Sequence, residues 1–423
     1  MPGGKIGKGR DPGFGLCGTM NDASRAAEKA ARDSYGRILA YLAARSHDIA
    51  SAEDALADAF AKALTKWPQD GVPGNPDAWI LTVARNRLVD RQRHQARFPT
   101  ESEIPDLPAS DASAGPLEDR RLALLMVCAH PAIAPDLHTP LMLQAVLGID
   151  AASIARLFLI SPAALAKRLV RAKAKIRDAG IPFDVPDTMQ LPERSAAIRE
   201  AIYALHAHDW LDPTDDFGEE ALFLADLLCR FMPEDAESLG LSALIAFSQS
   251  RRLARVMSGV LVPTELQDVS SWDETLISYG KRQLRRAHAL SSIGRFQIEA
   301  AIEEVHLARK DAGVTDWIAL SQLYYAHAKI APSVGAMVSQ AVVSANLHGA
   351  EHGLAELGHL ERQIGTGFQP YWAARAELLS RVGKIEQAKV CYDKAISLTT
   401  HPPVIRFLRE RCAALQDKKY CQC

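Results

Sequence analysis

Positively charged side chains are concentrated between Ser161 and Arg177, where six Lys or Arg residues occur without a single acid. Cations on one face of a helix suit contacts to DNA phosphates, and residues near the start of such a helix suit base edges in the major groove. An ordinary solvated helix face is the alternative interpretation. The candidate DNA-contacting residues here are Ser161, Ala163, Ala164, Lys167, Arg168, Arg171 and Lys175.

A second basic segment runs from Arg85 to Arg97 and contains five Arg and one acid. The apolar residues that precede and interrupt it recur at helical spacing from Trp79 to Val89. Such a helix could grip a single strand, by charge to its phosphates and by polar contacts to an exposed base. Taken alone, the pattern fits an amphipathic helix with an Arg-rich outer face equally well. The candidate residues are Arg85, Asn86, Asp90, Arg91 and Arg93.

Acidic residues are gathered in the first half of a predicted helix between Ser51 and Trp67. Acids at this end complement the helix dipole, so local stabilisation is one interpretation. The other is that they dock a basic surface of a partner protein. The candidate partner-binding residues are Glu53, Asp54, Asp58 and Phe60.

No group of residues has the spacing of a catalytic or metal-binding site. His206 and His208 are two residues apart, whereas a helical metal site prefers a spacing of four. The seven Cys include no CxxC pair, which favours free thiols in a reducing cytoplasm. The chain begins without the apolar segment of a secretory signal, and its longest uncharged stretch is too polar for a membrane span. We therefore expect a cytoplasmic protein without enzymatic activity, metal, cofactor or membrane partner.

Helical periodicity extends over almost the whole chain, so an all-α fold is predicted. Gly148 ends one predicted helix and Asp150 caps the next. Ser161 and Pro162 have the residue types of a helix start, at the N-cap and the first helical position. Two short helices and a tight turn predict a helix-turn-helix whose second helix carries the basic face. Its inward residues are Leu165, Leu169, Ala172 and Ile176.

Charge and length together indicate several domains. The 423 residues carry a net charge of −2, which by itself argues against a nucleic-acid-binding protein. That sum averages over blocks, because residues 98–119 contain six acids, four Pro and no base, as in a flexible acidic linker. Residues 1–19 are expected to be a flexible tail, with Met20 as an alternative start. The expected domains are two helical domains at 20–97 and 120–184 and a helical extension at 185–423.

One window of the extension matches a 34-residue helical-hairpin repeat at about residues 369–402. The large and small residues that interlock two helices of a tetratricopeptide-like repeat stand at the expected positions. Since one repeat cannot bury its own face, several must stack, and such arrays bind partner proteins. The matching residues are Trp372, Ala376, Gly383, Ala388, Tyr392 and Ala395.

The order of these segments resembles the extracytoplasmic-function class of bacterial RNA polymerase sigma factors. Residues 52–60 (AEDALADAF) resemble the region-two helix that binds the polymerase clamp. Residues 79–91 (WILTVARNRLVDR) resemble the helix that melts and reads the −10 element. The helix-turn-helix resembles region four, which reads the −35 element.

The resemblance implies particular partners. These are promoter DNA and the RNA polymerase core, at its beta-prime clamp and beta flap. Glu53, Asp54, Asp58 and Phe60 would contact the core, and a flipped base would lie near Asn86 and Asp90. The acidic linker would pass near the RNA exit path.

Three further motifs resemble the sigma group with a long C-terminal helical extension that ends in tetratricopeptide-like repeats. They are residues 128–132 (CAHPA), 168–173 (RLVRAK) and 179–183 (AGIPF). The chain departs from that group at 203–210 (YALHAHDW) and 333–342 (SVGAMVSQAV), so the signal or partner of the extension is open. The extension is expected to regulate activity in cis and to offer its repeats to a protein partner.

Two rival functions remain at this point. One is a one-component regulator that uses the helix-turn-helix without polymerase, which leaves the helix from Trp79 to Arg93 unexplained. The other is a repeat scaffold with a vestigial sigma module, toward which the alanines at 163, 164 and 166 point because they lack base-reaching polar groups.

Overall fold

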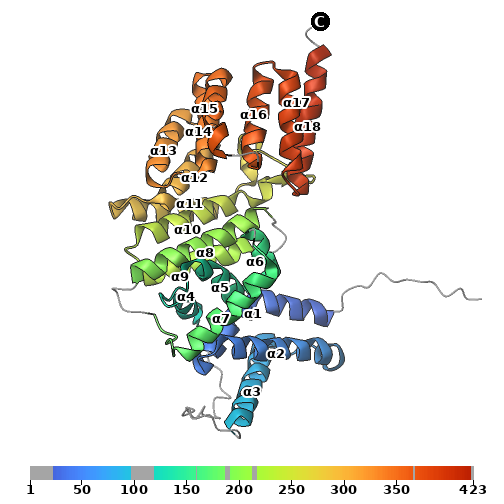
Figure 1. Cartoon of the computed structure of the whole chain (residues 1–423), viewed down its shortest axis with the longest axis vertical. Helices are drawn as coiled ribbons and strands as arrows, with labels where there is room; N and C mark the ends of the chain where they lie inside the picture. Colours follow the sequence, from blue (N-terminus) through green and yellow to red (C-terminus); the bar gives the residue numbers. More distant parts are fainter. Residues whose placement is uncertain are drawn as a thin grey trace, which may run out of the picture. The chain divides into compact units, whose positions relative to one another are not determined.

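The computed structural model describes residues 22–96, 119–158, 160–185, 191–211, 217–364 and 367–420 (Figure 1). The predicted tail at 1–19 lies outside these ranges, as does the predicted linker at 98–119 except for Asp119. The chain forms two compact units, an N-terminal unit within residues 1–185 and a C-terminal unit within residues 186–423.

The prediction of an all-α fold is confirmed over the described residues, which form helices apart from one short hairpin. The N-terminal unit contains α1 (Asp22–Ser46), α2 (Ile49–Asp70), α3 (Pro76–Ala96), α4 (Arg121–Cys128), α5 (Pro135–Leu147), α6 (Ala151–Leu157) and α7 (Pro162–Asp178). The C-terminal unit contains α8 (Leu191–Leu211), α9 (Phe217–Phe231), α10 (Ala236–Ser250), α11 (Glu274–Ala289), α12 (Arg295–Ala312), α13 (Trp317–Ile330), α14 (Val334–His348), α15 (Ala350–Ile364), α16 (Gln369–Arg381), α17 (Ile385–Ser397) and α18 (Pro402–Tyr420).

The hairpin pairs β1 (Val256–Met257) with β2 (Val260–Leu261) in antiparallel orientation. Its two turn residues, Ser258 and Gly259, have φ values of 51° and 77°. Positive φ at both central positions matches the right-handed twist of the flanking strands. The sequence pattern predicts no strand here, because strands of two residues are too short to show the alternation of apolar and polar residues that marks a strand.

Helices α1, α2 and α3 pack together in the N-terminal unit around Ile38, Leu56 and Ile80, all fully buried. The side chain of Asp48 accepts hydrogen bonds from the N–H groups of Ala50 and Ser51 and so caps α2. Asp77 at the start of α3 accepts hydrogen bonds from Ser34 and Arg37 of α1, each at 2.6 Å. These contacts fix the direction of α3, which carries the Arg-rich segment.

The segment from α5 to α7 follows the predicted local signals closely. Gly148 ends α5 in the left-handed conformation, with φ of 68°. Asp150 accepts hydrogen bonds from the N–H groups of Ala152 and Ser153 at 2.9 and 3.0 Å, which caps α6. Helix α7 begins at Pro162, with Ser161 extended at the N-cap position but making no side-chain capping bond. The four predicted inward residues, Leu165, Leu169, Ala172 and Ile176, are all buried.

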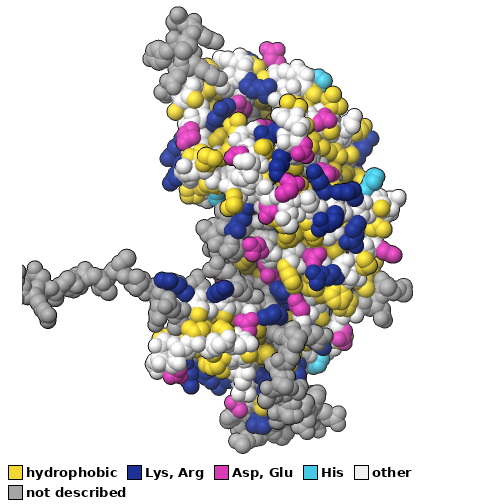
Figure 2. Space-filling view, turned by 180° about the vertical axis from the view of Figure 1, so that it is seen from behind, with side chains coloured by type: hydrophobic (Ala, Val, Ile, Leu, Met, Phe, Trp, Pro, Cys, Tyr) yellow, Lys and Arg dark blue, Asp and Glu magenta, His cyan; other side chains and the backbone are white. Residues whose placement is uncertain are grey.

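Helix α10 packs against α9, α11 and α12 in the C-terminal unit (Figure 1). Every residue of α10 except Glu237 is buried, and several are small enough to let a neighbouring helix approach closely. A Cβ on Gly240, for example, would come within 2.7 Å of the Gln297 backbone on α12. The face of the molecule seen in Figure 2 carries Lys and Arg side chains interspersed with Asp and Glu.

Helices α16 and α17 form the antiparallel hairpin expected from the repeat pattern, joined by a turn in which Gly383 has φ of 78°. Ala376, Ala388 and Ala395 are fully buried between the helices. Tyr392 is buried beside them, and its hydroxyl donates a hydrogen bond to Glu377 at 2.9 Å. The small residues therefore serve close helix contact, while membership of a repeat array stays a prediction.

Over the part of the chain that the structure describes, no helix has both the length and the apolar character needed to cross a membrane.

Helix α12 carries a histidine, His306, whose burial makes the stability of the folded chain depend on pH. Burial lowers the pKa of His306, against the nearby carboxylates of Glu303 and Glu265 and with the help of Arg251 and Arg309. The unfolded chain then binds a proton that the folded chain rejects, so stability falls as the pH drops through about 6.5. We expect scanning calorimetry of the full chain to show a lower Tm at pH 5.5 than at pH 7.5.

The substitution His306→Gln is expected to reduce that difference, and His359→Gln, at an exposed position of α15, is its matched control. Equal pH dependence in both variants would assign the effect to other groups.

Candidate nucleic-acid interface

Helices α2 and α3 bring the predicted acids and the predicted Arg-rich face together. Asp54 pairs with Arg91 at 2.7 Å, and Asp58 pairs with Arg87 at 2.7 Å. These residues and Asp90 line an open cavity of about 480 Å³. Because all four paired side chains are about half exposed, each pair contributes only about 0.2–1 kcal/mol. Either partner can therefore exchange its contact for a ligand at little cost.

The remaining predicted residues of α3 are spaced along its outer side. Ile80, Ala84 and Leu88 are buried against the bundle. Asn86, Asp90 and Arg93 are exposed and recur at the spacing of one helix face. Arg85 is half-buried, as is Phe60 on α2. Trp79 stands edge-on to Trp67 of α2, with ring centroids 5.5 Å apart, which anchors the start of α3. The structure thus separates Arg91, turned toward α2, from an exposed polar stripe.

Glu53 lies in a different environment from the other predicted acids. Both of its carboxylate oxygens accept hydrogen bonds from the ammonium of Lys173 on α7, at 2.5 and 2.6 Å. The Lys173 side chain is only 7% exposed and that of Glu53 21%. Burial raises the pKa of the Glu53 carboxyl above its ordinary value, although Lys173 acts in the opposite direction. The same burial raises the pKa of the neighbouring Cys128 thiol to about 12, so that thiol is protonated and unreactive.

The basic residues of α7 divide into two groups. Arg168 pairs with Asp136 of α5, and Lys175 donates to the carbonyl of Ala132 at 2.6 Å. Lys167 and Arg171, one turn apart, are exposed. Ala163 and Ala164, one turn earlier on the same side, are exposed as well, as is Ser161. The exposed stripe of α7 is therefore Ala163, Ala164, Lys167 and Arg171, which joins two cations to small residues near the helix start.

Sequence reasoning missed two features of this helix. Val170 is 67% exposed beside the cations, and an apolar group there suits a thymine methyl in the major groove. Lys173 counts toward the basic segment in the sequence but is buried in the structure. Its position four residues after Leu169 is the signal that could have revealed this, since it repeats the spacing of the inward face.

Comparison with known proteins adds the following matches. Residues 31–98, which include α2 and α3, match the sigma-70 region 2 family, and residues 194–288 match a family of unknown function (DUF6596). The uncharacterized protein R00370 of Rhizobium meliloti is 33% identical over 392 residues, covering 89% of this chain and 92% of that protein.

The probable RNA polymerase sigma factor RfaY of Xanthomonas campestris is 30% identical over 164 residues, covering 35% of this chain and 40% of that protein. No solved structure matches the chain. Helices α6 and α7 lie outside both family matches.

Proposed function

We propose that this chain, which belongs to the same family as protein R00370 of Rhizobium meliloti, is a bacterial sigma factor that binds RNA polymerase core and directs it to promoters. The observation that carries the proposal is the sigma-70 region 2 match over residues 31–98, which spans the α2–α3 face. The partial similarity to a probable sigma factor supports the same role. A protein of this class acts without catalysing a reaction and works in the cytoplasm.

The α2–α3 face would serve both polymerase and DNA. Asp54, Asp58 and the half-buried Phe60 would dock the beta-prime clamp of the core enzyme. The exposed polar stripe of Asn86, Asp90 and Arg93 would hold an unstacked base and the adjoining phosphates of the −10 element. Taking a base out of the stack costs a few kcal/mol, which phosphate contacts and polymerase binding must offset.

Helices α6 and α7 would act as a helix-turn-helix on the −35 element, near the beta flap. Lys167 and Arg171 suit phosphates, while Ser161, Ala163, Ala164 and Val170 lie where base edges would approach. Arg168 and Lys175 would contribute after giving up their present partners, Asp136 and the Ala132 carbonyl.

In this proposal the ion pair of Glu53 with Lys173 would break, and the N-terminal unit would open, before the chain engages a promoter. The −10 and −35 elements are named for positions about 25 base pairs apart. At 3.4 Å per base pair, they lie roughly 85 Å from each other. Helices α2 and α7, in direct contact through this pair, cannot reach both at once. Binding of polymerase to the acids of α2 would compete for Glu53 and release α7.

The C-terminal unit would regulate this activity in cis and would bind a protein partner on its tetratricopeptide-like hairpins. The proposal is tested by transcription from genomic DNA with purified core polymerase, followed by sequencing of transcript 5′ ends. We expect defined start sites that require the added chain, and a different yield from residues 1–185 alone. Transcription that is unchanged by the full chain would contradict the sigma role, and equal yields would contradict regulation in cis.

Charge on the exposed stripe of α7 yields a direct prediction for DNA binding. Replacing Lys167 and Arg171 by alanine is expected to weaken duplex binding uniformly across sequences. It should also reduce the slope of log affinity against log salt by about 2, since each lost phosphate contact removes about one unit. This slope is measured by fluorescence anisotropy of labelled duplex DNA at several salt concentrations between about 50 and 200 mM.

The matched control replaces Lys62 and Lys66, two exposed cations on α2, by alanine. Equal slopes in the two double variants would remove α7 from the DNA interface.

A further inference from the structure

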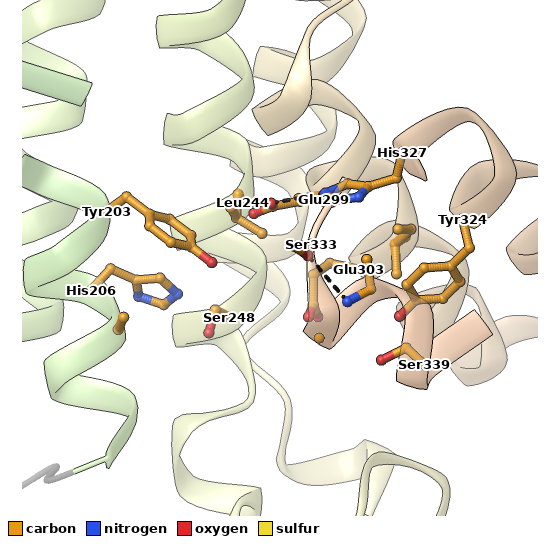
Figure 3. Close-up of a pocket in the computed structure, with 14 residues that line it drawn as sticks. Tyr203, His206, Leu244, Ser248, Glu299, Glu303, Tyr324, His327, Ser333 and Ser339 are labelled. Atoms are coloured by element: carbon orange, nitrogen blue, oxygen red, sulfur yellow. Dashed lines mark hydrogen bonds and ion pairs between the residues drawn. The ribbon is translucent and has the colours of Figure 1, made fainter. Parts of the chain in front are cut away.

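The C-terminal unit contains a cavity of about 480 Å³ that opens to solvent between five helices (Figure 3). Its walls come from α8, α10, α12, α13 and α14. Residues of 203–210 and of 333–342, the two segments where the chain departs from the sigma group it resembles, both line it. The volume falls within the range of small-molecule sites, about 300–1,000 Å³.

Two carboxylates on α12 line the cavity, and each is paired with an arginine of the protein. Glu299 accepts hydrogen bonds from Arg295 at 2.8 Å and from His327 at 3.1 Å (Figure 3). Glu303 is paired with Arg251. Burial opposes ionisation of Glu303, but Arg251, together with His306, Arg255 and His206, outweighs it and lowers the pKa of that carboxyl below its ordinary value. Both carboxylates are therefore held in fixed orientations by donors of the protein and can accept further hydrogen bonds.

The facing walls carry aromatic rings and hydroxyl groups. Tyr203 lies on the α8 side and Tyr324 on the α13 side, where its hydroxyl lies near Ser339 of α14 (Figure 3). Burial raises the pKa of Tyr324 to about 12, so its phenol stays protonated and can donate. Ser248 of α10 and Ser333, the N-cap of α14, are further polar groups of the lining. These side chains offer hydrogen bonds at several angles around flat apolar surfaces.

We propose that this cavity binds a neutral, hydroxyl-rich small molecule of about the size of a sugar or a nucleoside. Hydroxyl groups would donate to the free lone pairs of Glu299 and Glu303, and the ring or carbon skeleton would lie against Tyr203 and Tyr324. An organic cation gains less here, because Arg295 and Arg251 already hold the two carboxylates in ion pairs. An anionic group cannot donate a hydrogen bond to these carboxylate oxygens, whereas a neutral hydroxyl group can.

The test measures binding to the full-length protein and needs neither polymerase nor DNA, so it is independent of the sigma role. Thermal-shift screening followed by calorimetric titration would use three groups of probes. The neutral group contains glucose, galactose, trehalose, myo-inositol, adenosine and uridine. The cationic group contains putrescine and choline, and the anionic group contains citrate and glucose 6-phosphate. We expect at least one neutral probe to bind and the charged probes to bind more weakly or not at all.

Two variants link binding to this cavity. Ala336→Leu places a larger side chain into the space at the first turn of α14 and is expected to abolish binding. Tyr324→Phe removes one hydroxyl and is expected to weaken binding by about 3- to 10-fold, the effect of one lost hydrogen bond. Ala414→Leu, at an exposed position of α18, is the matched control for the added bulk and should bind as the unaltered chain does.

Three outcomes would overturn the proposal. They are no stabilisation by any neutral probe, preferential binding of a charged probe, or binding that Ala336→Leu leaves unchanged while the variant remains folded by circular dichroism. The first outcome would mean that the cavity holds only water.

Discussion

Replacing Lys173 by alanine should destabilise the N-terminal unit by roughly 3 kcal/mol, because it leaves Glu53 without its counter-charge in a largely buried site. The value lies at the lower end of the usual 3–5 kcal/mol for a broken buried pair, since the Glu53 side chain keeps 21% exposure. Helix α7 loses its charged attachment to α2 in this variant. Urea unfolding of the full chain, followed by circular dichroism, measures the change.

Two further variants separate the charge effect from a general loss of packing. Arg171→Ala removes an exposed cation from the same helix and is expected to change stability by less than about 0.5 kcal/mol. The double variant Glu53→Gln with Lys173→Met replaces the ion pair by neutral groups of similar size and should recover most of the lost stability. The buried-pair interpretation fails if Lys173→Ala is as mild as Arg171→Ala, or if the double variant is no more stable than the single one.

Gly36→Ala should be comparably damaging for a steric reason. A Cβ built on Gly36 of α1 would lie 2.0 Å from the carbonyl oxygen of Val146 on α5. The clash is with backbone, so no side-chain rotation relieves it, and α1 must move away from α5. Overpacking usually costs about 1–3 kcal/mol, and we expect a loss of about 3 kcal/mol or more at this site.

Gly74→Ala is the matched control, because a Cβ there meets no heavy atom within 4 Å. Since alanine also restricts the unfolded chain, this control should be neutral or slightly stabilising. Urea unfolding compares the two variants. If they show equal stability, the close approach of α1 to α5 is absent from the folded protein in solution.

Local signals account for much of what could be predicted. The limits of α5, α6 and α7 follow from Gly148, Asp150 and Pro162, each of which acts through its own backbone or its near neighbours. The same holds for the inward face of α7, where apolar residues recur at helical spacing. Asn86 and Asp90 share an exposed face because they are one helical turn apart, and this follows directly from their spacing in the sequence.

Contacts between distant segments could not be predicted from the sequence. The local patterns predict that Asp54 contacts the polymerase and Arg91 contacts DNA. The packing of α2 on α3 nevertheless brings the two side chains within 2.7 Å of each other. Glu53 and Lys173 are 120 residues apart, and nothing in either local pattern announces their pairing. The cavity of the C-terminal unit likewise joins Tyr203 to Ser339, although each looked like part of a separate divergent segment.

The sequence by itself determined the helical class, the limits of α5, α6 and α7, and the apolar residues of α7 that face inward. These depend on propensity, capping and periodicity, all of which act over a few residues. The tertiary structure alone decided which charges are paired, which cations stay exposed, and where polar groups gather around a cavity. Those outcomes depend on the distances between helix faces, and such distances arise only when packing brings remote segments together.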